Sequence, residues 1–186
     1  MKHTGREHRA VFLDLNGTLV LPVQADSLDE YKLIPGAVEA VRLLNQKGFV
    51  CPVVTVQSRI AKEVYSEEAF VQWFEGFQAA LSSNGAKVVG PYVCPHRTSD
   101  ACACAKPQAT LYKQAADAHS IDLSRSWVVG DTEGDIRSAL AIGALGGCYV
   151  RTGWGPQAGE SREEEAMFVG DDLLAVAHWI LEREIA

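Results

Sequence analysis

Short apolar segments rich in β-branched residues alternate along this chain with longer segments in which apolar residues recur at helical spacing. This alternation is typical of a parallel sheet with helices on both faces, because parallel strands need long crossover connections and helices supply them. The sequence therefore predicts an α/β fold. We expect its strands near residues 10–15, 49–55, 87–93, 126–130 and 146–151.

Helix signals separate the expected strands. One helix should follow Pro35-Gly36 and end near Lys47-Gly48, where glycine favours the end of a helix. Another should start after Ser66, a residue type that caps helices and that two glutamates follow here. Its aromatic residues recur at helical spacing and are expected in the core. Further helices are expected near residues 108–118, 134–142 and 171–184, and a loop over residues 153–165.

Size and charge limit the classes of function. A chain of 186 residues with 47% hydrophobic content fits one domain spanning residues 1–186. The net charge of −7 and the lack of a clustered Lys/Arg surface argue against a nucleic-acid partner, so any anionic partner should be small. No apolar run is long enough to span a membrane, and the polar first residues lack the apolar stretch of a secretory signal. We therefore expect a cytoplasmic protein without a membrane partner.

Polar motifs follow three of the expected strands. Asp14 ends the first strand and precedes a turn with Gly17, Thr55 ends the second, and residues 130–135 follow the strand that starts at Ser126. Ligands of open parallel sheets bind beyond the carboxyl ends of the strands. We therefore expect these motifs to form one site.

The residue types in these motifs suit phosphoryl transfer. Asp14 can attack phosphorus, and Asp131 can supply a second oxygen for Mg²⁺, which reduces the repulsion between two anions. Thr55 with nearby backbone amides can hold phosphoryl oxygens, and Lys106 can stabilise the transition state. A single aspartate at a strand end is more often a turn or helix cap. The occurrence of all four groups in order favours a catalytic site.

A cluster of cysteines lies in an expected loop at about residues 92–107. Cys94 and His96 form one close pair, Cys102 and Cys104 form another, and five residues separate the pairs. Three thiolates and one imidazole suit tetrahedral zinc, whereas disulfides are rare in cytosolic proteins. Four protein ligands leave no position for water, so this predicted zinc site should be structural. The loop leads directly to Lys106 and can position the substrate.

From Phe12 to about Gly155, the chain resembles the haloacid dehalogenase superfamily of phosphotransferases. The resemblance implies a Rossmann-like three-layer sandwich with a central parallel sheet, and an aspartyl-phosphate intermediate. By position, it implies that Asp14 is the nucleophile, that Thr55 binds phosphate and that Lys106 steadies it. The implied Mg²⁺ ligands are Asp14, the main-chain oxygen of Asn16 and Asp131, with Asp135 in support.

Together with the zinc loop, these motifs resemble the D-glycero-D-manno-heptose 1,7-bisphosphate phosphatase branch and the related histidinol-phosphate phosphatases. These proteins lack a large cap domain, which implies the same here and a monomer. The segment Thr-Val-Gln-Ser-Arg-Ile-Ala-Lys at residues 55–62 departs from the usual Thr-Asn-Gln-Ser-Gly-Ile-Ala-Arg, and Ala105 stands where an arginine is usual. Substrate or phosphate contacts are expected from Thr55, Gln57, Ser58, Arg59 and Lys62.

Asn16 occupies the position where the family usually has a second aspartate, which protonates the leaving oxygen and later activates water. An amide keeps the shape but cannot exchange that proton. Three explanations remain open: an engineered Asp-to-Asn variant, a natural phosphatase with another proton route, and a catalytically silent binding protein. The departures at Val56, Arg59 and Ala105 favour a divergent natural protein. The leading prediction is a magnesium-dependent phosphatase for a heptose bisphosphate-like sugar, with the binding protein and a histidinol-phosphate phosphatase-like enzyme as alternatives.

Overall fold

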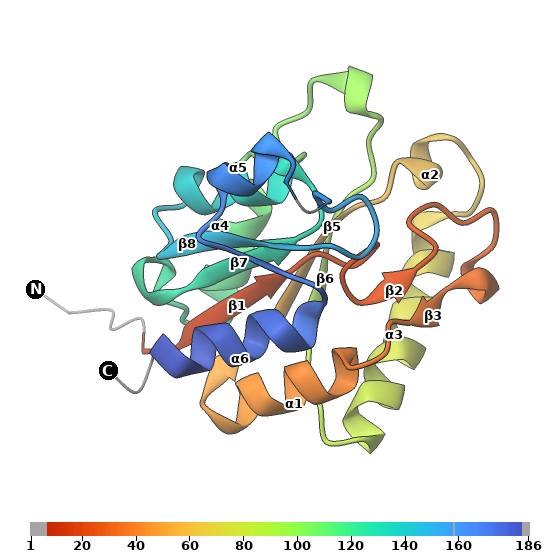
Figure 1. The fold of residues 1–186 in the computed structure, drawn as a ribbon. Helices are drawn as coiled ribbons and strands as arrows, with labels where there is room; N and C mark the ends of the chain where they lie inside the picture. Colours follow the sequence, from red (N-terminus) through yellow and green to blue (C-terminus); the bar gives the residue numbers. More distant parts are fainter. Residues whose placement is uncertain (1–6, 158, 184–186) are drawn as a thin grey trace, which may run out of the picture.

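The computed structural model describes residues 7–157 and 159–183. Among these residues, seven strands form one sheet in the order β6-β5-β1-β7-β8-β9, with β4 also paired to β1, and its pairings are parallel (Figure 1). The strands of this sheet are β1 (Arg9–Leu13), β4 (Phe49–Val50), β5 (Pro52–Val56), β6 (Val89–Cys94), β7 (Trp127–Gly130), β8 (Gly146–Val150) and β9 (Phe168–Gly170).

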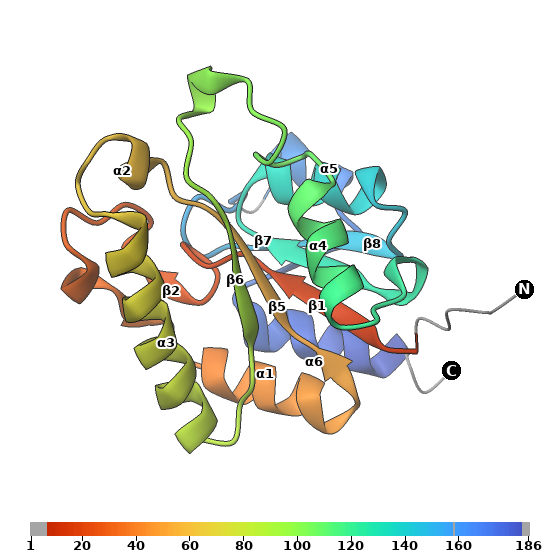
Figure 2. The same cartoon turned by 180° about the vertical axis from the view of Figure 1, so that it is seen from behind.

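Alternating side chains of β1 explain why helices cover both faces of the sheet. Val11 and Leu13 belong to one buried cluster, whereas Ala10 and Phe12 belong to a second one, as the twofold periodicity of a strand requires. The first cluster contains side chains of α1 (Ala37–Gln46), α3 (Glu67–Ser83) and α6 (Leu173–Arg183). The second contains side chains of α4 (Thr110–Ala118) and α5 (Glu133–Ala141), which Figure 2 shows from behind.

The predicted α/β class and the three-layer arrangement are confirmed. Each predicted helix is present within a few residues of its expected bounds; residue 184, the last of the final expected helix, lies outside the described residues. The strand expected at 49–55 is two strands, because Pro52 has no N–H to donate and interrupts the ladder. The loop expected at 153–165 ends in a short 3₁₀ helix, Ser161–Glu165, and residue 158 lies outside the described part.

A small antiparallel hairpin lies beside the sheet. Its strands β2 (Val20–Leu21) and β3 (Lys32–Leu33) pair Val20 with Leu33, and a 3₁₀ helix, Leu28–Glu30, lies between them. The hairpin directly follows the turn that carries Asp14 after β1. Figure 1 shows the hairpin near α3, away from α4 and α5.

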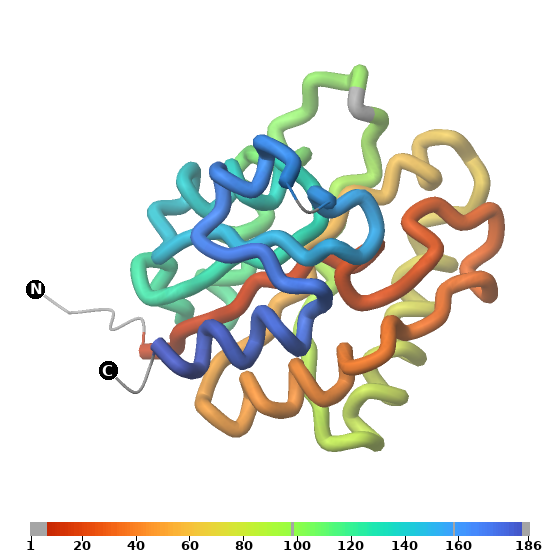
Figure 3. The backbone as a smooth tube through the Cα atoms, viewed as in Figure 1, coloured from red at the N-terminus to blue at the C-terminus, as the bar shows by residue number. Residues whose placement is uncertain are grey.

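Two connections lie side by side beyond the carboxyl edge of the sheet. The short helix α2 (Ser58–Ala61) follows β5, and residues 95–109 connect β6 to α4. Figure 3 shows this last connection projecting from the body of the protein beside α2. The guanidinium of Arg97 donates to the carbonyl of Ala61 through Nε (3.3 Å) and Nη2 (3.0 Å), which fixes the loop to α2. In the part of the chain that the structure describes, no helix has the length and apolar character needed to cross a bilayer.

Candidate active site

The turn after β1 holds Asp14 at the centre of the sheet. The N–H of Asp14 donates to the carbonyl of Val129 in the neighbouring strand at 2.9 Å, and the carbonyl of Leu15 accepts the N–H of Leu19 at 2.8 Å. Gly17 has φ +87°, and a Cβ at this position would collide with the carboxylate of Asp131. The turn therefore requires glycine, and this close approach brings the first and last motifs together.

Lys106 connects two carboxylates. Its Nζ lies 2.6 Å from Oδ1 of Asp14 and 2.5 Å from Oδ1 of Asp135, and all three side chains are almost fully buried. The second oxygen of Asp135 accepts the hydroxyl of Thr132 at 2.6 Å, which caps α5. Burial alone would lower the pKa of Lys106, but the negative charges of Asp135 and Asp14 outweigh it and raise this pKa well above its usual value. Lys106 is therefore a permanent cation beside Asp14, the predicted nucleophile.

Asp131 has one oxygen occupied and one without a partner. Its Oδ2 accepts the backbone N–H of Trp154 at 2.8 Å, whereas its Oδ1 is buried and has no hydrogen-bond partner among the described residues. Burial and then the charge of Asp14 raise the pKa of Asp131 to about 8, and burial raises that of Asp14 to about 6 although Lys106 opposes the shift. Crowded carboxylates with an unpaired buried oxygen fit a cation.

Ligand atoms of Asp14, Asp131 and Asp135 lie within 4.8 Å of one another. Asp135, expected as a supporting metal residue, directs its two oxygens to Lys106 and Thr132. Asp14 and Asp131 are therefore better placed to bind Mg²⁺, and Asp135 is better placed to position Lys106.

A second polar group of the site consists of Thr55, Gln57 and Asn16. The Nε2 of Gln57 lies 2.6 Å from Oδ1 of Asn16 and 2.9 Å from Oγ1 of Thr55. Thr55 is 1% exposed and does not line the cavity in front of Asp14, whereas Asn16, Gln57 and Ser58 do. The structure thus brings the predicted phosphate-binding residues together, with Thr55 behind the others.

A cavity of about 470 Å³ opens in front of these groups. The predicted residues Arg59 and Lys62 also line it. Four further lining residues carried no signal in the sequence: Val23, Gln24, Tyr31 and Arg97. Another lining residue, Trp154, lies in the glycine-containing loop that follows the last expected strand. Its side chain is half exposed, and its backbone N–H donates to Oδ2 of Asp131.

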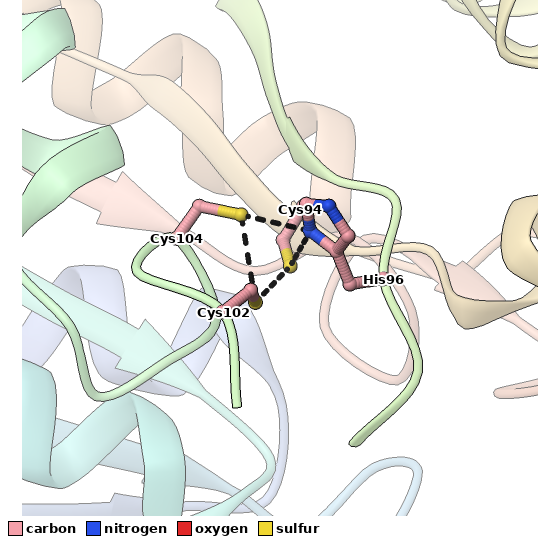
Figure 4. Close-up of side chains that lie close together, drawn as sticks. All are labelled: Cys94, His96, Cys102 and Cys104. Carbon is pink, nitrogen blue, oxygen red and sulfur yellow. Dashed lines mark hydrogen bonds between the residues drawn. The ribbon is translucent and has the colours of Figure 1, made fainter. Parts of the chain in front are cut away.

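The predicted zinc ligands converge as expected (Figure 4). Sγ of Cys94 lies 3.5 Å from Sγ of Cys102 and 3.7 Å from Nδ1 of His96, while Sγ of Cys104 lies 3.6 Å from Sγ of Cys102 and 3.2 Å from Nδ1 of His96. Tetrahedral zinc with bonds of about 2.0 to 2.3 Å requires ligand separations of roughly 3.5 to 3.8 Å. The separations of 3.5, 3.6 and 3.7 Å lie in this range and the one of 3.2 Å lies slightly below it, so the set of four residues fits this metal.

One thiol of the cluster is preorganised for a metal cation. Burial raises the pKa of Cys102, but backbone N–H groups of Cys104 and Ala105 and the thiol of Cys94 outweigh this effect and lower it to about 6. This lowered pKa favours the thiolate of Cys102, the form that binds metals. The cysteine cluster ends two residues before Lys106, so its geometry influences the position of that cation.

Comparisons with known proteins place this arrangement in a family. The HAD-hydrolase-like family matches residues 103–176. The D-glycero-β-D-manno-heptose-1,7-bisphosphate 7-phosphatase of Pseudomonas putida is 31% identical over 93% of this chain and 99% of its own length. The enzyme of the same name from Yersinia pestis is 35% identical over 77% of this chain and 81% of its own length.

A solved structure agrees with these relatives. The D,D-heptose 1,7-bisphosphate phosphatase of B. bronchiseptica, crystallised with magnesium and phosphate, superposes with a TM-score of 0.81 at 29% identity, covering 94% of this chain and 99% of that one. The resemblance inferred from the motifs is thereby confirmed. The chain belongs to the haloacid dehalogenase-like hydrolases, in the family of phosphoric monoester hydrolases that contains the D-glycero-β-D-manno-heptose-1,7-bisphosphate 7-phosphatases.

Proposed function

We propose that this protein is a magnesium-dependent phosphatase that acts on a small phosphorylated sugar, with Asp14 as the nucleophile. The observation that carries the proposal is that the buried Lys106 lies 2.6 Å from Asp14, close to Asp131, whose Oδ1 has no hydrogen-bond partner among the described residues. A carboxylate can attack a phosphoryl group only where positive charge offsets the repulsion between the two anions. Lys106 supplies one such charge, and the two carboxylates can hold another.

Each residue of the site has a separate role in the proposed reaction. Asp14 attacks phosphorus, its new P–O bond forms as the bond to the leaving oxygen breaks, and water then hydrolyses the aspartyl phosphate. Lys106 neutralises charge on the phosphoryl oxygens, and Asp135 holds Lys106 in place. Asp14, Asp131 and the main-chain oxygen of Asn16 are the groups that would hold Mg²⁺. When bound, this ion supplies positive charge and orients the phosphate.

The lining of the cavity supports a substrate with a second anionic group, such as a heptose bisphosphate. Arg59, Lys62 and Arg97 line the cavity in addition to Lys106. Arg59 is paired with Asp26 at 3.1 Å, and the Nε and Nη2 atoms of Arg97 donate to Ala61. Trp154 offers a half-exposed ring on which a sugar can pack.

Replacing Arg97 by glutamine is expected to raise KM for a sugar bisphosphate more than KM for the matching monophosphate, by roughly tenfold, because a charge-assisted contact to the second phosphate is lost. Steady-state phosphate release with both substrates measures the difference. Arg137→Gln is the matched control, since Arg137 lies on the exposed side of α5 and pairs with Glu133. Equal changes in both KM values would place the second anionic group elsewhere.

The affinity for Mg²⁺ is expected to increase with pH. Because the pKa of Asp131 is raised to about 8 and that of Asp14 to about 6, the metal must displace protons below these values. The apparent association constant should therefore rise by about tenfold per pH unit from pH 6, level off above pH 8, and rise more steeply below pH 6. Calorimetric titration in several buffers measures the association constant and the number of protons released. In Asp131→Asn the association constant should no longer change between pH 6 and pH 8. An affinity independent of pH in the native protein would contradict the assignment of Asp14 and Asp131 as Mg²⁺ ligands.

Zinc is expected to stabilise the loop that carries the cysteine cluster. Elemental analysis of protein purified without added metal should give about one zinc per chain, and Cys104→Ser should lower this content and the melting temperature. Phosphatase activity should fall too, since Lys106 follows the cluster. Cys51→Ala is the control, because Cys51 is buried outside the cluster. Zinc content unchanged by Cys104→Ser would exclude the proposed ligand set.

Phosphate release from a panel of sugar mono- and bisphosphates, with and without Mg²⁺, tests the proposed function. The second candidate is a binding protein without turnover, which the amide of Asn16 favours because no acid is present at that position. Running Asn16→Asp beside the native protein separates the two. The enzyme proposal fails if neither protein releases phosphate and neither binds Mg²⁺.

A further inference from the structure

A chain of hydrogen bonds couples the direction of the Asn16 amide to that of the Gln57 amide. Gln57 is 2% exposed, and both ends of its amide are engaged. Its Oε1 accepts the hydroxyl of Tyr65 at 2.9 Å, and its Nε2 donates to Oδ1 of Asn16 at 2.6 Å and to Thr55 at 2.9 Å. With Tyr65 as the donor, Gln57 can present only N–H groups to Asn16. The oxygen of Asn16 therefore faces Gln57.

The nitrogen of the same amide has no such partner. Nδ2 of Asn16 is buried and makes no hydrogen bond to any described residue, while Asn16 lines the cavity in front of Asp14. A buried amide N–H without an acceptor is unfavourable, and the oxygens of a phosphate ester are acceptors. A half turn of both amides would keep the contacts to Gln57 and Tyr65. It would also direct the oxygen of Asn16 at phosphate oxygens, which is repulsive.

We infer that Asn16 is a fixed hydrogen-bond donor to the leaving oxygen and that Gln57 and Tyr65 are positioning residues for this donor. The inference rests on the proposed function and extends it to a substrate class. Asn16 can stabilise the departing oxygen but transfers no proton. The electron pair of the broken P–O bond therefore leaves on an alkoxide or a related anion, which takes its proton from water afterwards.

This chemistry selects phosphate esters whose leaving oxygen is weakly basic. Without a general acid, the barrier depends on the basicity of the departing anion. Aryl phosphates and sugar phosphates esterified at the anomeric oxygen should therefore react faster than phosphates of primary alcohols. In a sugar with both kinds of phosphate, this chain should remove the anomeric one first.

Two readouts test the inference. The first compares kcat/KM for a series of aryl phosphates with phenols of increasing pKa. We expect kcat/KM to fall steeply with increasing phenol pKa for the native protein and only slightly for Asn16→Asp. Equal slopes for the two proteins would overturn the proposed role of Asn16. The product of a sugar bisphosphate, identified by phosphorus NMR, should lack the anomeric phosphate. Prior loss of the primary phosphate would overturn the substrate class.

The second readout does not depend on turnover. The side-chain NH₂ signals of Asn16, assigned by their absence in Asn16→Asp, should shift when inorganic phosphate and Mg²⁺ bind. Tyr65→Phe removes the donor that fixes Gln57 and should reduce this shift, with folding verified by its amide spectrum. Unchanged NH₂ signals despite bound phosphate would overturn the donor role. Absence of phosphate binding, together with absence of hydrolysis of any ester by either protein, would instead contradict the proposed function.

Discussion

Asn16→Asp is expected to raise kcat for alkyl phosphates by roughly 100- to 10,000-fold, the usual contribution of general acid-base catalysis. A carboxyl group at this position can protonate the leaving oxygen and then take a proton from the attacking water. The surroundings suit the change, because Gln57 and Thr55 already direct hydrogen-bond donors at Oδ1 of Asn16, where the carbonyl oxygen of a carboxyl group would accept them while its second oxygen carries the proton. Rates of phosphate release at saturating Mg²⁺ measure the gain.

Asn16→Ala is the matched control for this gain. It removes the amide without adding an acid, so we expect it to be no faster than the native protein. Its rate should be lower if the hydrogen bond from Nδ2 contributes. An increase in rate for alanine as large as that for aspartate would show that the side chain at position 16 only obstructs the site. No increase for aspartate would mean that another group already transfers the proton.

The sheet was predictable because each long strand is a run of apolar, β-branched residues, and strong local patterns survive in the fold. The missed strands β2 and β3 have two residues each and β9 has three, too few to show a period. Pairing of Val20 with Leu33 depends on the path of the intervening residues, which tertiary contacts determine. The strands that the sequence did not predict are therefore those that form through contacts with distant parts of the chain.

The candidate site was predictable to the extent that strand ends meet at one edge of a parallel sheet. Asp14 and Asp131 lie together for this reason, and the four predicted zinc ligands lie together because their loop is short. Tyr65 and Arg97 had no such signal. Tyr65 reaches Gln57 across the short helix α2, and Arg97 is brought to the cavity by its bonds to Ala61. The positions of these two residues depend on how the loops pack against each other, which the sequence pattern does not indicate.

Lys106 illustrates what the structure adds to a motif. The sequence indicated a cation near the phosphate, whereas the structure shows Lys106 held by Asp135, which Thr132 holds in turn. A flexible lysine in water would lose side-chain freedom on binding phosphate. This lysine has already lost it, because its Nζ is fixed at 2.5 Å from Asp135. The preorganised charge supports catalysis more strongly than the presence of a lysine does.

Asp14→Asn is expected to abolish phosphate release, with a loss of about 10,000-fold or more, because an amide cannot form the covalent intermediate. The native protein is already slow if Asn16 limits it, so the loss is best measured in the Asn16→Asp background. Mass spectrometry of acid-quenched reactions should detect a phosphorylated chain with Asp14 present and none with asparagine. A retained phosphorylated chain in the Asp14→Asn protein would assign the nucleophile to another residue.

Loss of folding is separable from loss of the nucleophile. Burial raises the pKa of Asp14 to about 6, so the charge that this group carries at neutral pH is less favourable in the folded protein than in the unfolded chain. A group with a raised pKa stabilises the fold most below its unfolded pKa and loses that contribution as the pH rises through about 6. Asparagine has no charge to bury, and Lys106 keeps Asp135 as a partner. The melting temperature of metal-free Asp14→Asn at neutral pH should therefore not fall, so a large loss of activity at unchanged stability identifies a chemical role.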